Sequence, residues 1–319
     1  MEATIEVTGL RKRFGPTLAL DGMTFTVLPG QVTGFVGPNG AGKSTTMRVI
    51  LGLDAADDGT ALVSGHPYWT LRHPLSQVGA LLDAGALQPS RSARNHLLFL
   101  AQTQGLPTTR VDEMLGMVGL QDVARKRARG FSLGMSQRLG IAAALLGDPE
   151  VLLFDEPVNG LDPEGVLWIR NLMKQLAAEG RTVFVSSHLM NEMAVTADHL
   201  IVIGRGKLIT ESSTEDVIAR STDQSVRVRT PGADRLAALI AEAGGQAAPG
   251  PPGPGAGLLT VTGLESSRIG ELAASGSIVL HELTPLASLE EAFMELTSGS
   301  VEFGAHGADP VNAGEGSAR

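Results

Sequence analysis

The stretch Gly37-Pro38-Asn39-Gly40-Ala41-Gly42-Lys43-Ser44-Thr45 decides the fold of this chain. It fits the pattern G-x-x-x-x-G-K-[ST] and lies between the strand-like run Val32–Val36 and the helical run Thr46–Leu51. Glycines let such a loop wrap a polyphosphate with its N–H groups inward, and the following helix turns its positive end to the same anion. In this arrangement Lys43 neutralises the β and γ oxygens of a nucleotide, and the Ser44 hydroxyl can ligate Mg²⁺. A glycine-rich turn that binds nothing is the alternative, and the strand–loop–helix context disfavours it.

A second acidic segment supports nucleotide chemistry. The apolar run Val151–Phe154 ends in Asp155 and Glu156. An acid at the carboxyl edge of a parallel strand lies where ligands bind in open α/β sheets. We therefore expect Asp155 to hold Mg²⁺ through a water and Glu156 to polarise a water for attack on the γ-phosphate. The alternative is that one acid caps the next helix while the other is solvated.

The first 220 residues alternate short β-branched runs with longer helical patterns, which predicts an α/β sheet within a domain spanning residues 1–220. Residues of about 84–147 have helical spacing and few β-branched runs, which predicts a helical insertion. The other predicted strands are Thr4–Val7, Thr24–Val27, Thr182–Ser186 and Leu200–Ile203.

The C-terminal third has a different composition. Residues 221–300 are predicted to form a small α/β accessory domain, with three strand–helix pairs over 224–297. Within it, the stretch Gly244–Gly257 is so rich in Gly and Pro that it cannot sustain a helix or a central strand. Residues 301–319 are rich in Gly and Ala and are predicted to be a disordered tail.

Composition excludes several classes of protein. The 319 residues are 43% hydrophobic and contain no cysteine, which rules out disulfide scaffolds, thiolate metal sites and cysteine nucleophiles. A net charge of −9 argues against nucleic acid as a partner. The basic run Arg125–Arg129 suggests nucleic acid or anionic lipid, but on an acidic protein it is more typical of a solvated helix end. No signal peptide and no 18-residue apolar run is evident, so we expect a soluble protein.

A further motif narrows the choice. The segment Phe131-Ser132-Leu133-Gly134-Met135 resembles the LSGGQ signature of ATP-binding cassette (ABC) proteins. The resemblance implies that Ser132 and Gly134 contact the γ-phosphate of the ATP bound by the other subunit. Taken without the resemblance, Ser132 could equally be the N-cap of the helical run Gln137–Leu146.

Three other segments resemble motifs of ABC proteins. Asn159–Pro163 resembles the D-loop, whose Asp162 links the two active sites across a dimer. His188 after Ser186-Ser187 resembles the switch histidine that contacts the γ-phosphate, although a lone histidine at a strand end is more often a polar residue on the protein surface. Phe14 before Gly15 resembles the aromatic residue that stacks on adenine, and a core phenylalanine is the alternative.

One position departs from the family pattern. The Q-loop of the family carries Gln or Glu, and Asp83 stands there in this chain. Its carboxylate is one methylene shorter than that of Glu and is charged, unlike Gln. The resemblance therefore implies a contact of Asp83 with Mg²⁺ through water rather than directly.

The ordered motifs cover about residues 4–220 and identify the chain as resembling an α/β P-loop NTPase of ABC type. The phrases GALLDAGAL, SARNHL, FSLGMSQRLGIAAALLGDP and PVNGLDPEG are similar to the ATPase subunits of ABC-2-type exporters of the daunorubicin- or bacitracin-resistance type. The closing stretch Ser288–Thr297 resembles the terminal helix of that subgroup.

The resemblance implies a homodimer that sandwiches two MgATP and hydrolyses them. Because the chain shows no membrane segment, transport would need a separate ABC-2-type permease, contacted by the helical insertion and the Q-loop at the cytoplasmic face of the membrane. The exported compound would be a drug, an antibiotic or a lipid-like molecule. A soluble ABC ATPase acting on ribosomes or DNA is the alternative, although heptads and a second cassette are absent from the sequence. A kinase or GTPase would leave Ser132–Arg138 unexplained.

Overall fold

The computed structural model of the chain describes residues 3–220, 225–249 and 257–285. Its centre is a six-stranded sheet in the order β5-β6-β7-β3-β8-β9, parallel except for β9 at one edge. Every residue of β3 and of β6 is buried, as expected where helices or a second sheet cover both faces of a parallel sheet. Because β7 pairs with both β6 and β3, the loops that follow these three strands lie at one edge. The strands are β3 (Val32–Val36), β5 (Val78–Leu81), β6 (Val151–Asp155), β7 (Thr182–Ser187), β8 (His199–Gly204) and β9 (Lys207–Ser213).

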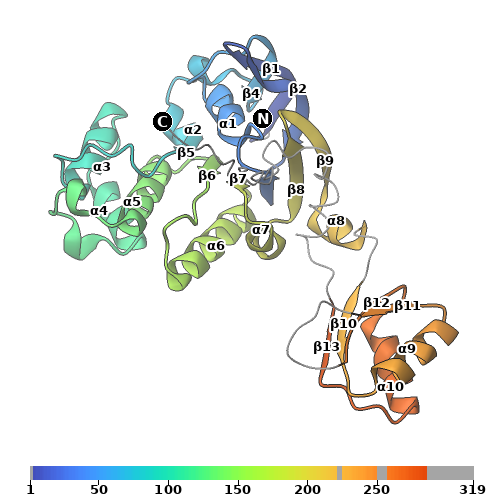
Figure 1. Ribbon diagram of the computed structural model, residues 1–319. Helices are drawn as coiled ribbons and strands as arrows, with labels where there is room; N and C mark the ends of the chain where they lie inside the picture. Colours follow the sequence, from blue (N-terminus) through green and yellow to red (C-terminus); the bar gives the residue numbers. More distant parts are fainter. Residues whose placement is uncertain (1–2, 221–224, 250–256, 286–319) are drawn as a thin grey trace, which may run out of the picture.

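A three-stranded antiparallel sheet in the order β2-β1-β4 lies against one face of this sheet, together with α1 (Lys43–Ile50) (Figure 1). An aromatic cluster joins the two sheets: the rings of Phe25, Phe35 and Phe184 lie 5.0–5.8 Å apart, centroid to centroid. The strands are β1 (Ile5–Phe14), β2 (Thr17–Val27) and β4 (Asp58–Val63).

Helices α6 and α7 cover the opposite face, and α3 to α5 form a separate group beside the edge strand β5 (Figure 1). The group occupies the part predicted as a helical insertion. Its helix α5 packs on β5, since a Cβ added to Gly140 would lie 2.5 Å from Leu81. The helices are α2 (Pro74–Gln77), α3 (Ala93–Thr103), α4 (Thr109–Met117), α5 (Leu133–Leu145), α6 (Pro163–Ala178), α7 (Met190–Thr196) and α8 (Thr214–Arg220), with single 3₁₀ turns at Tyr68–Thr70, Gln121–Val123 and Ala128–Gly130.

The basic run Arg125–Arg129 does not lie at an α-helix end. Arg125–Arg127 connect the second and third of these 3₁₀ turns, Ala128 and Arg129 belong to the third, and the four cationic residues of the run are exposed. The exposure agrees with the predicted solvation of the charges, and the helical part of the run is a 3₁₀ turn rather than an α-helix end.

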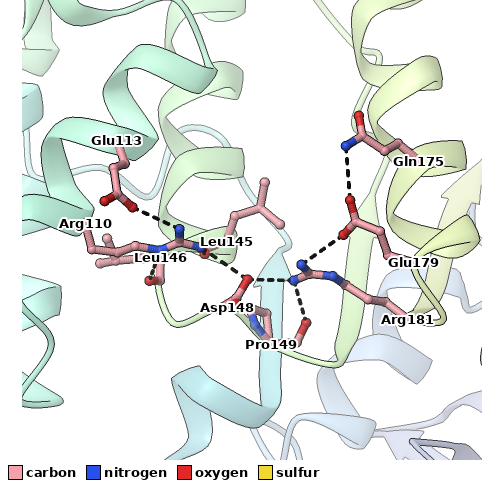
Figure 2. Close-up of polar contacts among 9 residues, drawn as sticks. All are labelled: Arg110, Glu113, Leu145, Leu146, Asp148, Pro149, Gln175, Glu179 and Arg181. Carbon is pink, nitrogen blue, oxygen red and sulfur yellow. Dashed lines mark hydrogen bonds and ion pairs between the residues drawn. The ribbon is translucent and has the colours of Figure 1, made fainter.

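A polar network joins the helical group to the sheet (Figure 2). The Asp148 carboxylate accepts from Arg110 of α4 at 3.2 Å and from Arg181, just before β7, at 3.0 Å. Arg110 also donates to the carbonyl oxygens of Leu145 and Leu146 at the end of α5, where a cation interacts well with the helix dipole. Asp148, just after α5, therefore connects α4 to the residue that precedes β7.

The C-terminal residues form a four-stranded antiparallel sheet in the order β11-β12-β10-β13. The succession β-α-β-β-α-β corrects the prediction of three strand–helix pairs, because two strands rather than one lie between the helices. Pro249 is tolerated because β11 is an edge strand. The elements are β10 (Val226–Arg229), α9 (Ala233–Glu242), β11 (Gln246–Pro249), β12 (Leu258–Thr262), α10 (Ser266–Ser275) and β13 (Glu282–Pro285).

The predicted terminal helix Ser288–Thr297 and the predicted tail 301–319 lie outside the described residues. No helix within residues 3–220, 225–249 and 257–285 has both the length and the apolar character that crossing a bilayer requires.

Candidate nucleotide site

The phosphate loop connects β3 to α1 and depends on its glycines. Gly42 has φ +106°, and a Cβ there would lie 2.8 Å from the Leu20 side chain and 3.0 Å from the Ala19 carbonyl oxygen. A Cβ on Gly37 would lie 2.6 Å from the carbonyl oxygen of Ile203. Only glycine fits these positions, because one is left-handed and both touch backbone. The loop residues Asn39–Thr45 line a hollow of about 250 Å³, here called the phosphate cradle, together with Ala19 and Glu156.

Lys43 is the buried cation of the phosphate cradle. Its Nζ donates to the carbonyl oxygens of Gly37 at 2.7 Å and Pro38 at 3.3 Å, and lies 3.6 Å from Glu156 Oε1. Burial lowers the pKa of Lys43, while the carboxylates of Glu156 and Asp155 act in the opposite direction. The loop thus presents a desolvated positive charge, which suits a polyphosphate.

Glu156 lies between Lys43 and His188. Its Oε2 is 2.7 Å from His188 Nδ1, which comes directly after β7. His188 therefore contacts the acid that lines the cradle. The pairing of β6 with β7 brings the two together across 32 residues of sequence.

Asp155 and Ser44 are oxygen donors beside this pair. Asp155 is 9% exposed and accepts a hydrogen bond from Ser186 Oγ, and the Ser44 hydroxyl is exposed in the first turn of α1. In the part of the chain that the structure describes, no group of three or more His, Asp or Glu side chains could hold a metal ion. One hydroxyl and one carboxylate nevertheless fit Mg²⁺, which prefers oxygen and takes its other ligands from phosphate and water.

The predicted signature segment begins α5. Ser132 is the N-cap of this helix, and its Oγ accepts from the Met135 N–H at 3.2 Å. The segment packs on Asn159–Pro163, since a Cβ on Gly134 would lie 3.1 Å from the Gly160 carbonyl oxygen. Asp162 caps α6 by accepting from the Gly165 N–H at 2.9 Å. Ser132, Gly134 and Asp162 do not line the phosphate cradle of their own chain.

Phe14 and Asp83 lie apart from the cradle. Phe14 ends β1 and is 47% exposed, which excludes the alternative of a core phenylalanine, and Lys12 Nζ lies 5.1 Å from its ring centroid. Asp83 follows β5, and its Oδ1 accepts from the Gly85 N–H at 2.6 Å. Asp83 lines a different groove, of about 460 Å³, rather than the cradle.

Two neighbours of Glu156 were not predicted as site residues. Ser186 Oγ accepts from the Glu156 N–H at 3.0 Å, and Gln137 Nε2 donates to the Glu156 carbonyl oxygen at 3.1 Å. Ser186 precedes His188 within a motif that was noticed, so its place at the strand end was a usable signal. Gln137 lies within the signature-like segment Ser132–Arg138, but nothing in the sequence relates its side chain to Glu156.

Two family profiles match the chain, one in the N-terminal part and one in the C-terminal part. A family profile described as "ABC transporter" matches residues 20–159, and another, described as "Domain of unknown function (DUF8746)", matches residues 224–290. The bacitracin transport ATP-binding protein BcrA of Bacillus licheniformis is 40% identical over 214 residues, which cover 66% of this chain and 70% of BcrA. The Nod factor export ATP-binding protein I of Paraburkholderia xenovorans is 36% identical over 223 residues, or 68% of this chain and 73% of that protein.

Among solved structures, the fold resembles the dimeric ATP-binding cassette MJ0796 in a post-hydrolysis state bound to ADP and Pi. The TM-score is 0.60 and the sequence identity 25%, over 66% of this chain and 98% of the cassette.

Proposed function

This chain belongs to the ABC transporter family of ATP-binding proteins and is an ATPase, and from that premise we propose that it energises a separate ABC-2-type permease of an exporter. Relatives named for bacitracin transport and Nod factor export support a drug, an antibiotic or a lipid-like compound as the exported molecule. The observation that carries the chemistry is the Glu156 carboxylate, which faces the phosphate cradle between Lys43 and His188.

The residues in and beside the phosphate cradle have different roles in hydrolysis. Lys43 and the loop N–H groups bind the phosphates, and the γ-phosphate competes with Glu156 for the Lys43 ammonium. Glu156 then accepts a proton from the attacking water, and His188 holds the carboxylate in place from its other oxygen. Ser44 and, through water, Asp155 would hold Mg²⁺, which supplies positive charge to the phosphate oxygens when bound.

A second copy of the chain completes each site in this proposal. Ser132 and Gly134 lie outside the cradle of their own chain and belong to an exposed helix start, whose N–H groups suit an anion. Asp162 lies beside them at the start of α6. The dimeric arrangement of MJ0796 supports a homodimer in which these residues face the partner's ATP.

An apolar groove supports contact with the permease. The groove of about 460 Å³ runs between β5, the end of α1 and the helical group, and it includes Asp83. Trp69 is 73% exposed and packs near Gly52. Gly52 stands in the sequence between Leu51 and Leu53, which both line the groove. A large exposed aromatic side chain beside an apolar groove is typical of an interaction site. We place this groove at the cytoplasmic face of the membrane, against the permease.

Replacing Glu156 by Gln tests the chemistry. E156Q removes the proton acceptor and keeps the shape, so ATP turnover should fall by about 100-fold or more while ATP still binds. The matched control is E150Q, because Glu150 is exposed and directly precedes the same strand. Turnover of E156Q at the rate of E150Q would contradict the role of Glu156.

The partner is tested separately. The tagged chain is purified from its own cells in mild detergent, and the co-purified proteins are identified. We expect a stoichiometric partner with several apolar spans of about 20 residues. A ribosomal or other soluble partner, with none in the membrane fraction, would favour a soluble ABC ATPase and contradict the exporter.

A further inference from the structure

Gln137 is a buried polar side chain without a role in the site described so far. It lies in the second turn of α5 and is 3% exposed. Its Nε2 donates to the carbonyl oxygen of Glu156 at 3.1 Å. An amide buried so completely is costly unless it is hydrogen-bonded. The partner of this amide is the backbone carbonyl of Glu156, the residue whose carboxylate faces the phosphate cradle.

The backbone of Glu156 needs such support. The φ of Glu156 is +49°, in the left-handed region that residues with a Cβ rarely adopt. Such a backbone conformation persists only when surrounding contacts hold it. The Glu156 N–H donates to Ser186 Oγ at 3.0 Å. The Glu156 carbonyl accepts from Gln137 and from the Asn159 N–H at 3.2 Å. The peptide groups on both sides of the Glu156 Cα are thus anchored.

The direction of the carboxylate depends on these anchors. A carboxylate oxygen of Glu lies about 4 Å from the backbone axis, so a rotation of about 15° around φ or ψ moves it by about 1 Å. A displacement of about 1 Å of a catalytic group can slow a reaction about 100-fold. The contact at 2.7 Å with His188 and the separation of 3.6 Å from Lys43 both require this direction to be kept.

We propose that Gln137 is a positioning residue for ATP hydrolysis, whose amide holds the Glu156 peptide so that the carboxylate faces the phosphate cradle. The same helix carries Gly134 in its first turn and Ser132 as its cap, so Gln137 connects the signature segment to the base of its own chain. This inference rests on the role proposed for Glu156.

The test separates turnover from binding in the full-length chain. Q137M keeps the length of the side chain and removes the donor, and the matched control Q175M makes the same change at an exposed position of α6. Loss of the bond should lower kcat about tenfold relative to Q175M, and the Kd of a non-hydrolysable ATP analogue should stay within about twofold. A kcat equal to that of Q175M, or a Kd that rises as much as kcat falls, would overturn the proposal.

A donor-retaining variant adds a second comparison. In Q137H the imidazole Nε2 can reach the position of the Gln137 amide nitrogen and donate to the same carbonyl, so kcat should recover to within about threefold of the unmodified chain. Q137L is apolar and also lacks the donor, and it replaces Q137M if that variant does not fold. Equal losses in Q137H and the donor-free variant would overturn the proposal.

The outcome for E156Q shows whether the role of Glu156 fails or only the positioning role of Gln137. If E156Q hydrolyses ATP at the control rate, the role of Glu156 fails and the inference fails with it. If E156Q is inactive while Q137M matches Q175M, the role of Glu156 stands and only the positioning role of Gln137 fails.

Discussion

Replacement of Asp148 by Ala should destabilise the junction between the helical group and the central sheet. The Asp148 carboxylate accepts from Arg110 at 3.2 Å and from Arg181 at 3.0 Å (Figure 2). Its backbone has φ +57°, in the left-handed region. The substitution therefore removes two ion pairs and places a residue with poor left-handed propensity at a strained position.

The expected loss follows from these two effects. The Asp148 side chain is 65% exposed, so each pair contributes only about 0.5 kcal/mol. The left-handed backbone adds about 1 kcal/mol for Ala, because Asp tolerates this region better. Neither Arg110 nor Arg181 is left unpaired, since they keep Glu113 and Glu179. We expect D148A to cost about 2 kcal/mol and D148N, which retains the backbone preference, about 1 kcal/mol.

Thermal unfolding followed by circular dichroism measures the effect. For a domain of this size, about 2 kcal/mol corresponds to a fall in Tm of about 5 °C for D148A, and D148N should show about half of it. The difference between unmodified chain and D148N should shrink in 1 M NaCl, because salt screens exposed pairs. Equal Tm values for D148A and D148N would refute the backbone argument, and a salt-independent D148N effect would refute the electrostatic one.

Three further outcomes are expected. F14A should raise the Kd for ATP about fivefold and F14Y should not, if the exposed ring stacks on adenine; equal affinities would contradict this. Burial lowers the pKa of His96 below its ordinary value of 6.5, so the unfolded chain binds a proton more readily and Tm should fall between pH 7.5 and 5.5. H96Q should reduce that fall, and an unchanged pH dependence would contradict the assignment. G160A places a Cβ onto Leu133 at φ +75°, so it should lower both Tm and turnover more than G180A, which is left-handed in open space. Equal effects of the two would exclude a specific contact.

The buried part of the fold could be predicted from short stretches of sequence. The strand Val32–Val36 was predicted with its observed bounds, and Val151–Phe154 within one residue. Parallel strands covered on both faces are continuous apolar runs, and a phosphate loop is a contiguous motif. Each signal is complete within fewer than ten residues, so no tertiary information was needed.

Strands with one exposed side were harder to predict. β1 extends to Phe14, well beyond the predicted Thr4–Val7. The prediction stopped too early because Arg11–Arg13 are polar and register shifts interrupt the pairing after Val7. β9 and β4 were not predicted, since β9 ends in the polar run Thr210–Ser213, β4 begins with Asp58-Gly59-Thr60, and each strand lies at an edge of its sheet. Their stability comes from neighbouring strands, which a local pattern does not contain.

The site was predictable in its motifs and not in its contacts. The order of the motifs singled out Glu156 and His188, but their contact at 2.7 Å depends on the pairing of β6 with β7. The hydrogen bond from Gln137 to Glu156 spans 19 residues and depends on the tertiary packing that brings α5 next to the residue that follows β6. Asp83, predicted from the resemblance to approach Mg²⁺, lines the apolar groove instead, and a contact with the metal stays a prediction.

In the proposed homodimer, each ATP is hydrolysed by residues from two copies of the chain. K43A should inactivate the phosphate cradle and leave the signature segment intact, whereas S132R should do the reverse, so each variant alone is inactive. The decisive measurement is the ATPase rate of an equimolar mixture. In mixed dimers one site combines an intact Lys43 with an intact Ser132, so we expect recovery toward about a quarter of the unmodified rate. A mixture no more active than K43A or S132R alone would show that the two copies do not share their sites.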